Sequence, residues 1–120
     1  MNLKVPCHVI IQHVAKEFEV SYSDIVSRRK GPKILDARRA AYAIVSEMRK
    51  DLPIITIARV FRGRDHSSVI KGIDRAKRQR AHDEAFAAKW LAVTDKAYGW
   101  RPPERFEIFS KVGGVEQRAA

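Results

Sequence analysis

Residues 65–68 read Asp-His-Ser-Ser and place a carboxylate, an imidazole and two hydroxyls next to one another. An acid, a base and a nucleophile of these types perform acyl transfer when they converge in space. Here they follow a helix-breaking glycine and precede an apolar run, so they are expected in the first turn of a helix. Because successive helical residues point about 100° apart, the three groups diverge, and no catalytic triad is predicted.

The same side chains can instead hydrogen-bond outward from the start of a helix. Residues 54–61 are almost all apolar and predict a short, mostly buried helix, which a turn at Gly63 separates from a second helix over about 65–80. Asp65 or His66 lies near the N-terminus of that helix. Two helices joined by a short glycine-containing turn are typical of a helix-turn-helix, whose second helix meets base edges in the major groove.

Positive charge is concentrated around this unit and in one earlier segment. The net charge is +10, and residues 28–50 and 59–80 each carry eight Lys or Arg against two acids, which leaves −2 for the rest. Such concentration indicates a polyanion binder. The first segment opens with Arg28-Arg29-Lys30, a loop ended by Gly31-Pro32, for which we expect phosphate or minor-groove contact. The alternatives are a solvated loop and a surface made basic for solubility.

Other chemistries find little support in the residue spacing. Cys7 and His8, with His13 further on, lack the ligand spacing of zinc sites. No Gly-x-x-x-x-Gly-Lys-Ser/Thr stretch is present, so no bound nucleotide is expected. Because paired carboxylates and metal-ligand spacing are missing as well, we predict that the chain is not an enzyme and has no cofactor. No apolar run is long enough to span a membrane. A single cysteine fits a reducing compartment, and together with the expected polyanion binding it predicts a cytoplasmic, nucleoid-associated protein.

The remaining pattern predicts an all-α chain, since no segment alternates with a period of two. Helices are expected over residues 6–19, over a short stretch capped by Ser21 or Ser23, over 34–50 and over 83–98. On the long helix an apolar stripe leaves Arg38 and Arg39 on other sides. On the helix over 65–80 the inward positions are expected to be Val69, Ile70, Ile73 and Ala76, and the outward ones Ser67, Lys71, Asp74, Arg75 and Arg78.

Residues 61–69 read Phe-Arg-Gly-Arg-Asp-His-Ser-Ser-Val. They resemble the signature of the C-terminal DNA-binding domain of the bacterial replication initiator DnaA, where a Phe-Gly-Gly turn leads into Gly-Arg-Asp-His-Thr-Thr-Val. The order of basic loop, long helix, short apolar helix and signature helix is similar as well, over about residues 8–80. The upstream ATP-binding module of that family has no counterpart here. We therefore expect a stand-alone DNA-binding domain that lacks the ATP-driven module.

The resemblance implies a compact helical bundle with a Trp-repressor-like helix-turn-helix that binds a short asymmetric duplex site, the DnaA box. It implies base readout by Asp65, His66 and Ser67, and support on the duplex from Ser68 and Arg64. It places Lys30 in the minor groove. Two departures bear on the site: Ser67 and Ser68 lack the methyl of threonine, and Arg62 replaces a glycine. With charge added, the predicted DNA-binding residues are Arg28, Arg29, Lys30, Arg64, Asp65, His66, Ser67, Ser68, Lys71 and Arg75.

We therefore expect sequence-specific binding of double-stranded DNA, in transcription regulation or as a modulator of replication. The alternatives are an adaptor that binds protein or RNA through the same helical surface, and an accessory subunit of a nucleic-acid enzyme. The expected domain spans residues 1–98, with the helix over 83–98 added to the DnaA-like part, and 99–120 form a partly flexible extension. Residues 83–120 are the candidates for contact with a second copy or a protein partner.

Overall fold

The computed structural model describes residues 4–102, and these form six helices and no strand. The all-α prediction is thus confirmed. Of the predicted extension over 99–120, the part after Pro102 lies outside the described residues. In chain order the helices are α1 (Cys7–Phe18), α2 (Tyr22–Val26), α3 (Pro32–Met48), α4 (Ile54–Val60), α5 (His66–His82) and α6 (Glu84–Tyr98).

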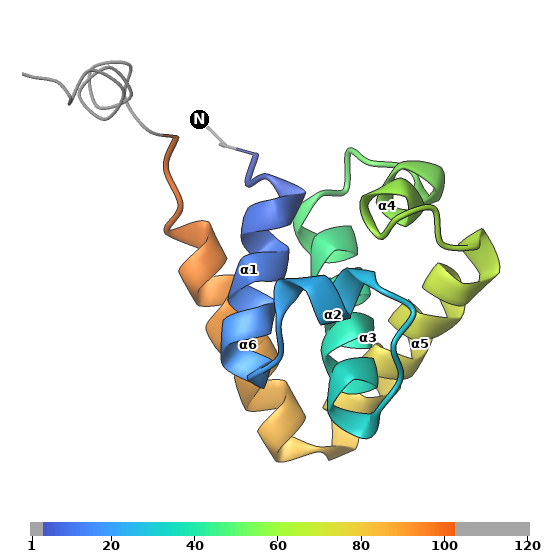
Figure 1. The fold of residues 1–120 in the computed structure, drawn as a ribbon. Coiled ribbons are helices and arrows are strands. Elements are labelled where there is room, and N and C mark those ends of the chain that lie inside the picture. The colour runs from blue at the N-terminus through green and yellow to red at the C-terminus, as the bar shows by residue number, and fades with distance from the viewer. Residues whose placement is uncertain (1–3, 103–120) are drawn as a thin grey trace, which may run out of the picture.

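Helix α3 forms the centre of the bundle (Figure 1). Its middle turns are buried without interruption from Ala40 to Val45, because α1 and α5 pack against it from two sides. Of the predicted stripe, Ala37, Ala41, Ile44 and Val45 are fully buried, and Met48 is partly buried. Helix α6 lies along α1 on one side of the molecule, and α4 and the first half of α5 lie on the other. The bundle therefore holds the signature segment away from α6.

Local signals explain where the helices begin. The side chain of Ser21 accepts from the backbone N–H of Asp24 at 2.9 Å and caps α2, and Asp83 accepts from the N–H of Phe86 at 3.1 Å and caps α6. Helix α3 begins at Pro32, two residues before the predicted Ile34. Proline is favoured in a first turn because its missing N–H would have had no helical partner there.

Helices α3 and α5 cross closely at Gly72. A Cβ built at this position would lie 2.6 Å from a carbon of the Tyr42 ring, nearer than nonbonded carbons approach. The ring cannot easily turn away, since Tyr42 packs edge-to-face on the buried Phe61 with centroids 4.6 Å apart. Glycine within a helix lowers its stability relative to alanine, and here the close packing of two helices requires it.

The helix predicted over residues 83–98 forms as α6 and extends the core. Its buried face carries Phe86, Trp90, Val93 and Ala97. Phe86 meets Phe18 of α1 edge-to-face at 5.7 Å, and the guanidinium of Arg80 lies 4.0 Å above the Trp90 ring. Within residues 4–102, no helix combines the length and the apolar character needed to cross a membrane.

Candidate nucleic-acid interface

The turn between α4 and α5 is closed by hydrogen bonds to one carbonyl. The oxygen of Ala58 accepts from the backbone N–H groups of Phe61, Gly63 and Arg64 at 3.0–3.1 Å. Arg62 and Gly63 both have positive φ, at 62° and 73°, a region that glycine adopts freely and arginine does not. Phe61 is buried and anchors the turn to Tyr42. The predicted helix-turn-helix is confirmed, although α4 buries only Ile57 and Ala58 and is less buried than expected.

The first turn of α5 presents the predicted polar residues to solvent. Asp65 is the N-cap, and its carboxylate accepts from the N–H of Ser68 at 3.4 Å. Asp65, His66, Ser67 and Ser68 are all exposed, as are Lys71 and Arg75 on the following turns. The four polar side chains at the start of α5 and the two cations further along it are therefore all accessible to a nucleic acid.

The basic loop is fastened to the bundle by Arg38, which is only 4% exposed. Its Nε donates to the carbonyl of Ile25, and its Nη2 donates to those of Asp24 and Arg29, each at 2.8 Å. Burial, followed by the nearby charge of Arg64, lowers the pKa of Arg38. The prediction that Arg38 lies off the buried stripe was wrong, because three backbone acceptors satisfy its guanidinium inside the fold.

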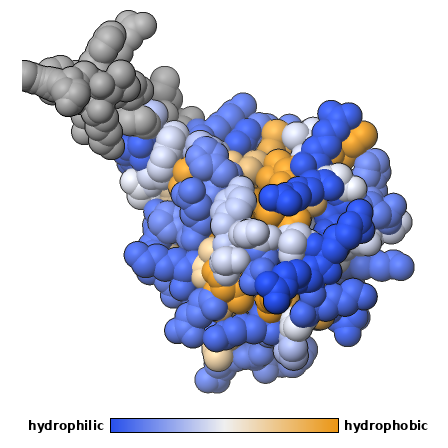
Figure 2. Space-filling view, in the orientation of Figure 1, coloured by the Kyte–Doolittle hydropathy of each residue, from blue (hydrophilic) through white to orange (hydrophobic). Residues whose placement is uncertain are grey.

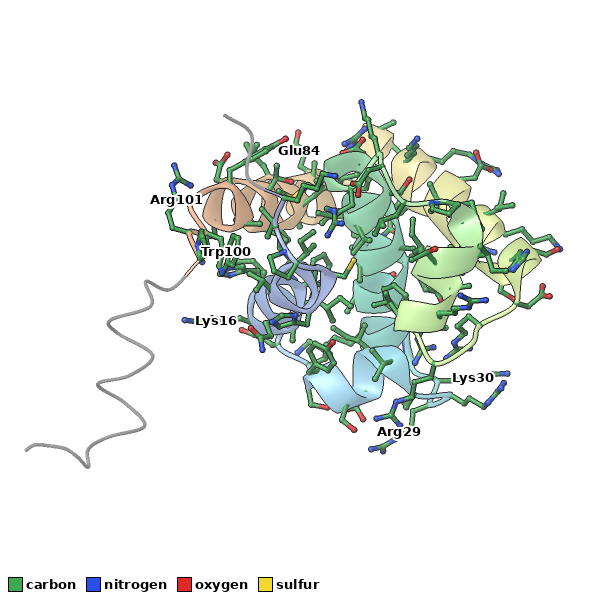
Figure 3. All side chains as sticks on the ribbon, turned by 90° about the horizontal axis from the view of Figure 1, so that it is seen from above. Lys16, Arg29, Lys30, Glu84, Trp100 and Arg101 are labelled. Atoms are coloured by element: carbon green, nitrogen blue, oxygen red, sulfur yellow. The ribbon has the colours of Figure 1, made fainter. Side chains whose placement is uncertain are left out.

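Arg64 connects the basic loop to the helix-turn-helix. Its Nη2 donates to the carbonyl of Ser27, 37 residues earlier in the chain. Arg28, Arg29 and Lys30 are exposed, and Figure 3 shows Arg29 and Lys30 directed away from the bundle. Arg29 lies 3.3 Å from the carboxylate of Asp24. The loop and the start of α5 are thus joined by a hydrogen bond into one surface, and this surface is hydrophilic in Figure 2.

A shallow groove of about 260 Å³ lies between α3 and α5 on this surface. Arg39 from α3 faces Lys71 and Arg75 from α5 across it, and Arg64 and Ser68 line it as well. Its cationic and hydroxyl donors suit phosphate oxygens. Arg39 was not among the predicted contact residues. Its charge was evident in the sequence, but its place opposite α5 depends on how the two helices cross.

Of the ten predicted DNA-binding residues, Arg64, Ser68, Lys71 and Arg75 meet at this groove, and Asp65, His66 and Ser67 lie beside it at the start of α5. Arg28, Arg29 and Lys30 join them through the bond from Arg64 to Ser27. Ile70 departs from its predicted place. It was expected inside, and its side chain is 53% exposed, because it lies about 100° around the helix from the buried Val69.

Comparison with known proteins matches the part of the chain that carries this interface to one protein family. The family model described as the bacterial dnaA protein helix-turn-helix matches residues 7–76. A chromosomal replication initiator protein DnaA from Nautilia profundicola is 38% identical over 87 residues, covering 72% of this chain and 20% of the relative. That of Thermomicrobium roseum is 29% identical over 90 residues, covering 75% and 19%. The chain thus spans about a fifth of the length of these relatives.

Proposed function

This chain belongs to the bacterial dnaA helix-turn-helix family, and on that basis we propose that it binds double-stranded DNA at specific sequences. Membership of the family supports DNA binding. The observation that carries the proposal of specificity is the bond from Arg64 to Ser27, which joins the exposed polar turn of α5 to the basic loop. A reader of this kind needs both, since phosphate contacts fix the register on the duplex and base-edge contacts distinguish sequences.

In the proposed complex the first turn of α5 enters the major groove. Asp65 can accept from cytosine N4, and His66 can reach a guanine or adenine edge. Ser67 and Ser68 supply short donors and acceptors. The carboxylate of Asp65 remains exposed although it caps the helix, so it can serve both the fold and the base. Readout by these four residues gives the complex its sequence preference.

Cationic side chains around that turn are proposed to hold the duplex. Lys71 and Arg75 on α5 line a groove with Arg39 on α3. In the proposed complex these three side chains contact the phosphates of one DNA strand. Arg28 and Arg29 bind phosphate from the basic loop, and Lys30 enters the adjacent minor groove. Arg64 acts mainly by holding the loop, because its Nη2 is engaged by the carbonyl of Ser27. Arg38 and Arg64 thus position the basic loop, from which Arg28 and Arg29 contact the phosphate backbone of DNA.

The biological role proposed is occupancy of DnaA-box-like sites, without catalysis or a cofactor. Occupancy alone can repress a promoter, and it can also compete with a full-length initiator for the same boxes. We favour transcription regulation, with modulation of replication as the second use, and association with the nucleoid follows from either. Contact with a second copy or a protein partner through residues 83–120 stays a prediction, which sedimentation of the protein alone would test.

Selection from random duplexes tests the proposal directly. The purified protein is incubated with a library of random double-stranded DNA at moderate salt, and bound molecules are amplified over several rounds. An enriched asymmetric motif of box-like length is expected, since one α5 and one loop read one site. An enriched inverted repeat would indicate a dimeric reader. Equal enrichment of all sequences would overturn sequence-specific binding, and preference for single-stranded RNA in a parallel selection would favour the adaptor alternative.

A further inference from the structure

Ile70 is the only large apolar side chain that is strongly exposed on α5, a helix that the structure describes along its whole length. Its exposed fraction of 53% contrasts with Val69 and Ala76, which are fully buried on the same helix. A single exposed isoleucine on an ordinary surface needs no explanation. On α5, however, the position of Ile70 suggests a reason for its exposure.

The side chain of Ile70 projects between the directions of two proposed base-reading residues. At about 100° per residue, the direction of Ile70 lies between those of His66 and Ser67, about 40° from the first and about 60° from the second. It lies one turn further along α5, on the edge that would enter the groove. Lys71 and Arg75 point toward α3 and the phosphate-binding groove instead. Ile70 is therefore placed among the base-reading groups and apart from the phosphate-binding ones.

The exposed residues next to Ile70 are polar, so Ile70 is the side chain on this edge of α5 that can make an apolar contact with a base. In the major groove thymine presents a C5-methyl group that only an apolar surface recognises. Ser67 and Ser68 offer hydroxyls and no methyl, so the exposed side chains of the first turn of α5 are all polar. Burying an exposed isoleucine against a methyl removes apolar surface of both partners from water.

We propose that Ile70 is a specificity-determining residue that contacts the C5-methyl group of thymine in the bound site. This inference rests on the proposed function, because it requires α5 to lie in the major groove. Ile70 then distinguishes thymine from cytosine and uracil one turn beyond the contacts of His66 and Ser67. The contact adds apolar recognition to a surface whose other members recognise bases through hydrogen bonds.

A methyl-deletion scan tests the contact. Each thymine of the selected duplex is replaced singly by deoxyuridine, which removes the methyl and preserves base pairing. Binding is then measured for the wild type, Ile70→Ala and Leu91→Ala. Leu91 is a matched control because it is also an exposed aliphatic residue, on α6 at the opposite side of the bundle. Circular dichroism checks that both variants are folded.

For the wild type, one or two deoxyuridine positions should weaken binding by about fourfold each, the equivalent of about 0.8 kcal/mol for one buried methyl-sized group. In Ile70→Ala those positions should lose their effect, and affinity for the unmodified duplex should already be lower by a similar factor. Leu91→Ala should behave as the wild type.

Two failures are distinguishable. Suppose the wild type prefers the selected duplex over a scrambled one but Ile70→Ala responds to deoxyuridine as the wild type does. Then the thymine contact is wrong and the proposed function stands. If the wild type shows no preference between selected and scrambled duplexes, the proposed function and this inference are both overturned.

Discussion

The guanidinium of Arg38 and the backbone carbonyl of Arg29 are joined by a hydrogen bond of 2.8 Å. One arginine is buried in the central helix, and the other belongs to the exposed basic loop. The buried residue fixes the backbone so that the exposed one can present its charge. Two more carbonyls, of Asp24 and Ile25, depend on the same guanidinium, so the C-terminal end of α2 and the loop are held together.

Arg38→Met should lower the free energy of unfolding by about 3 kcal/mol, because three carbonyl groups lose their donor and a buried unpaired polar group costs about 1–3 kcal/mol. Urea unfolding followed by circular dichroism measures the change. Arg39→Met is the matched control on the next residue. It should change stability by less than about 0.5 kcal/mol and weaken DNA binding. Equal destabilisation by the two substitutions would contradict the assigned role of Arg38.

Gly72→Ala should destabilise the protein by up to about 2 kcal/mol, although alanine is the better helix former by about 1 kcal/mol. The new Cβ would overlap the ring of Tyr42, and overpacking costs about 1–3 kcal/mol. In a Tyr42→Leu background the overlap is absent, and the same substitution should become stabilising. Thermal unfolding of the four proteins measures the coupling. A stabilising Gly72→Ala in the wild-type background would show that α3 and α5 cross less closely.

Arg62→Gly should raise the free energy of unfolding by about 0.5–1 kcal/mol, because Arg62 has a φ of +62° and the left-handed region costs other residues about 1–2 kcal/mol. Part of that gain is offset by the greater freedom of glycine in the unfolded chain. Gly63→Ala is the opposite case. Its φ is +73°, and a new Cβ would meet no atom within 4 Å, so a loss of about 1 kcal/mol is expected from backbone strain alone. Changes of the same sign in the two variants would exclude this account of the turn.

Asp51 makes stability depend on pH below about 4. Its carboxylate accepts from Nε and Nη2 of Arg49, both at 3.0 Å, which lowers the pKa of Asp51 from 3.8 to about 2. Since the folded value lies below the unfolded one, this stabilisation is complete above about pH 4 and is lost as the pH falls through about 2. The stability difference between the wild type and Asp51→Asn should therefore shrink between pH 5 and pH 2 in thermal unfolding. A difference that is constant with pH would contradict the pairing.

Much of this fold could be predicted because its signals are local. The prolines at 32 and 53, the caps Ser21 and Asp65, and the apolar periodicity each act within a few residues. The observed helices accordingly begin and end close to the predicted positions. The signature segment could be assigned for the same reason, since the turn and the exposed start of α5 are encoded in adjacent residues.

Three features were not predicted from the sequence. Arg38 is buried only because carbonyls 9 to 14 residues away accept from it. Gly72 is required only where α5 crosses Tyr42. Ile70 looked like a core residue because apolar type is the strongest signal of an inward position, whereas its side chain lies at the exposed edge of the helix.

The central claim is that α5 reads bases while the basic loop binds the backbone, and substitutions can separate these two contributions. His66→Ala should cost about 1–3 kcal/mol on the selected duplex and almost nothing on a scrambled one, because only base contacts are lost. Arg29→Ala should weaken both complexes. It should also make the salt dependence of binding shallower by about one unit, since one phosphate contact is removed.

The most direct measurement is fluorescence anisotropy of the selected and scrambled duplexes with the wild type, His66→Ala and Arg29→Ala at several salt concentrations. For about five neutralised phosphates, the plot of log K against log salt should have a slope of about −4 to −5 for the wild type. Loss of discrimination in His66→Ala, with its slope unchanged, would agree with the account. A wild-type slope near zero, or equal weakening of both duplexes by His66→Ala, would contradict it.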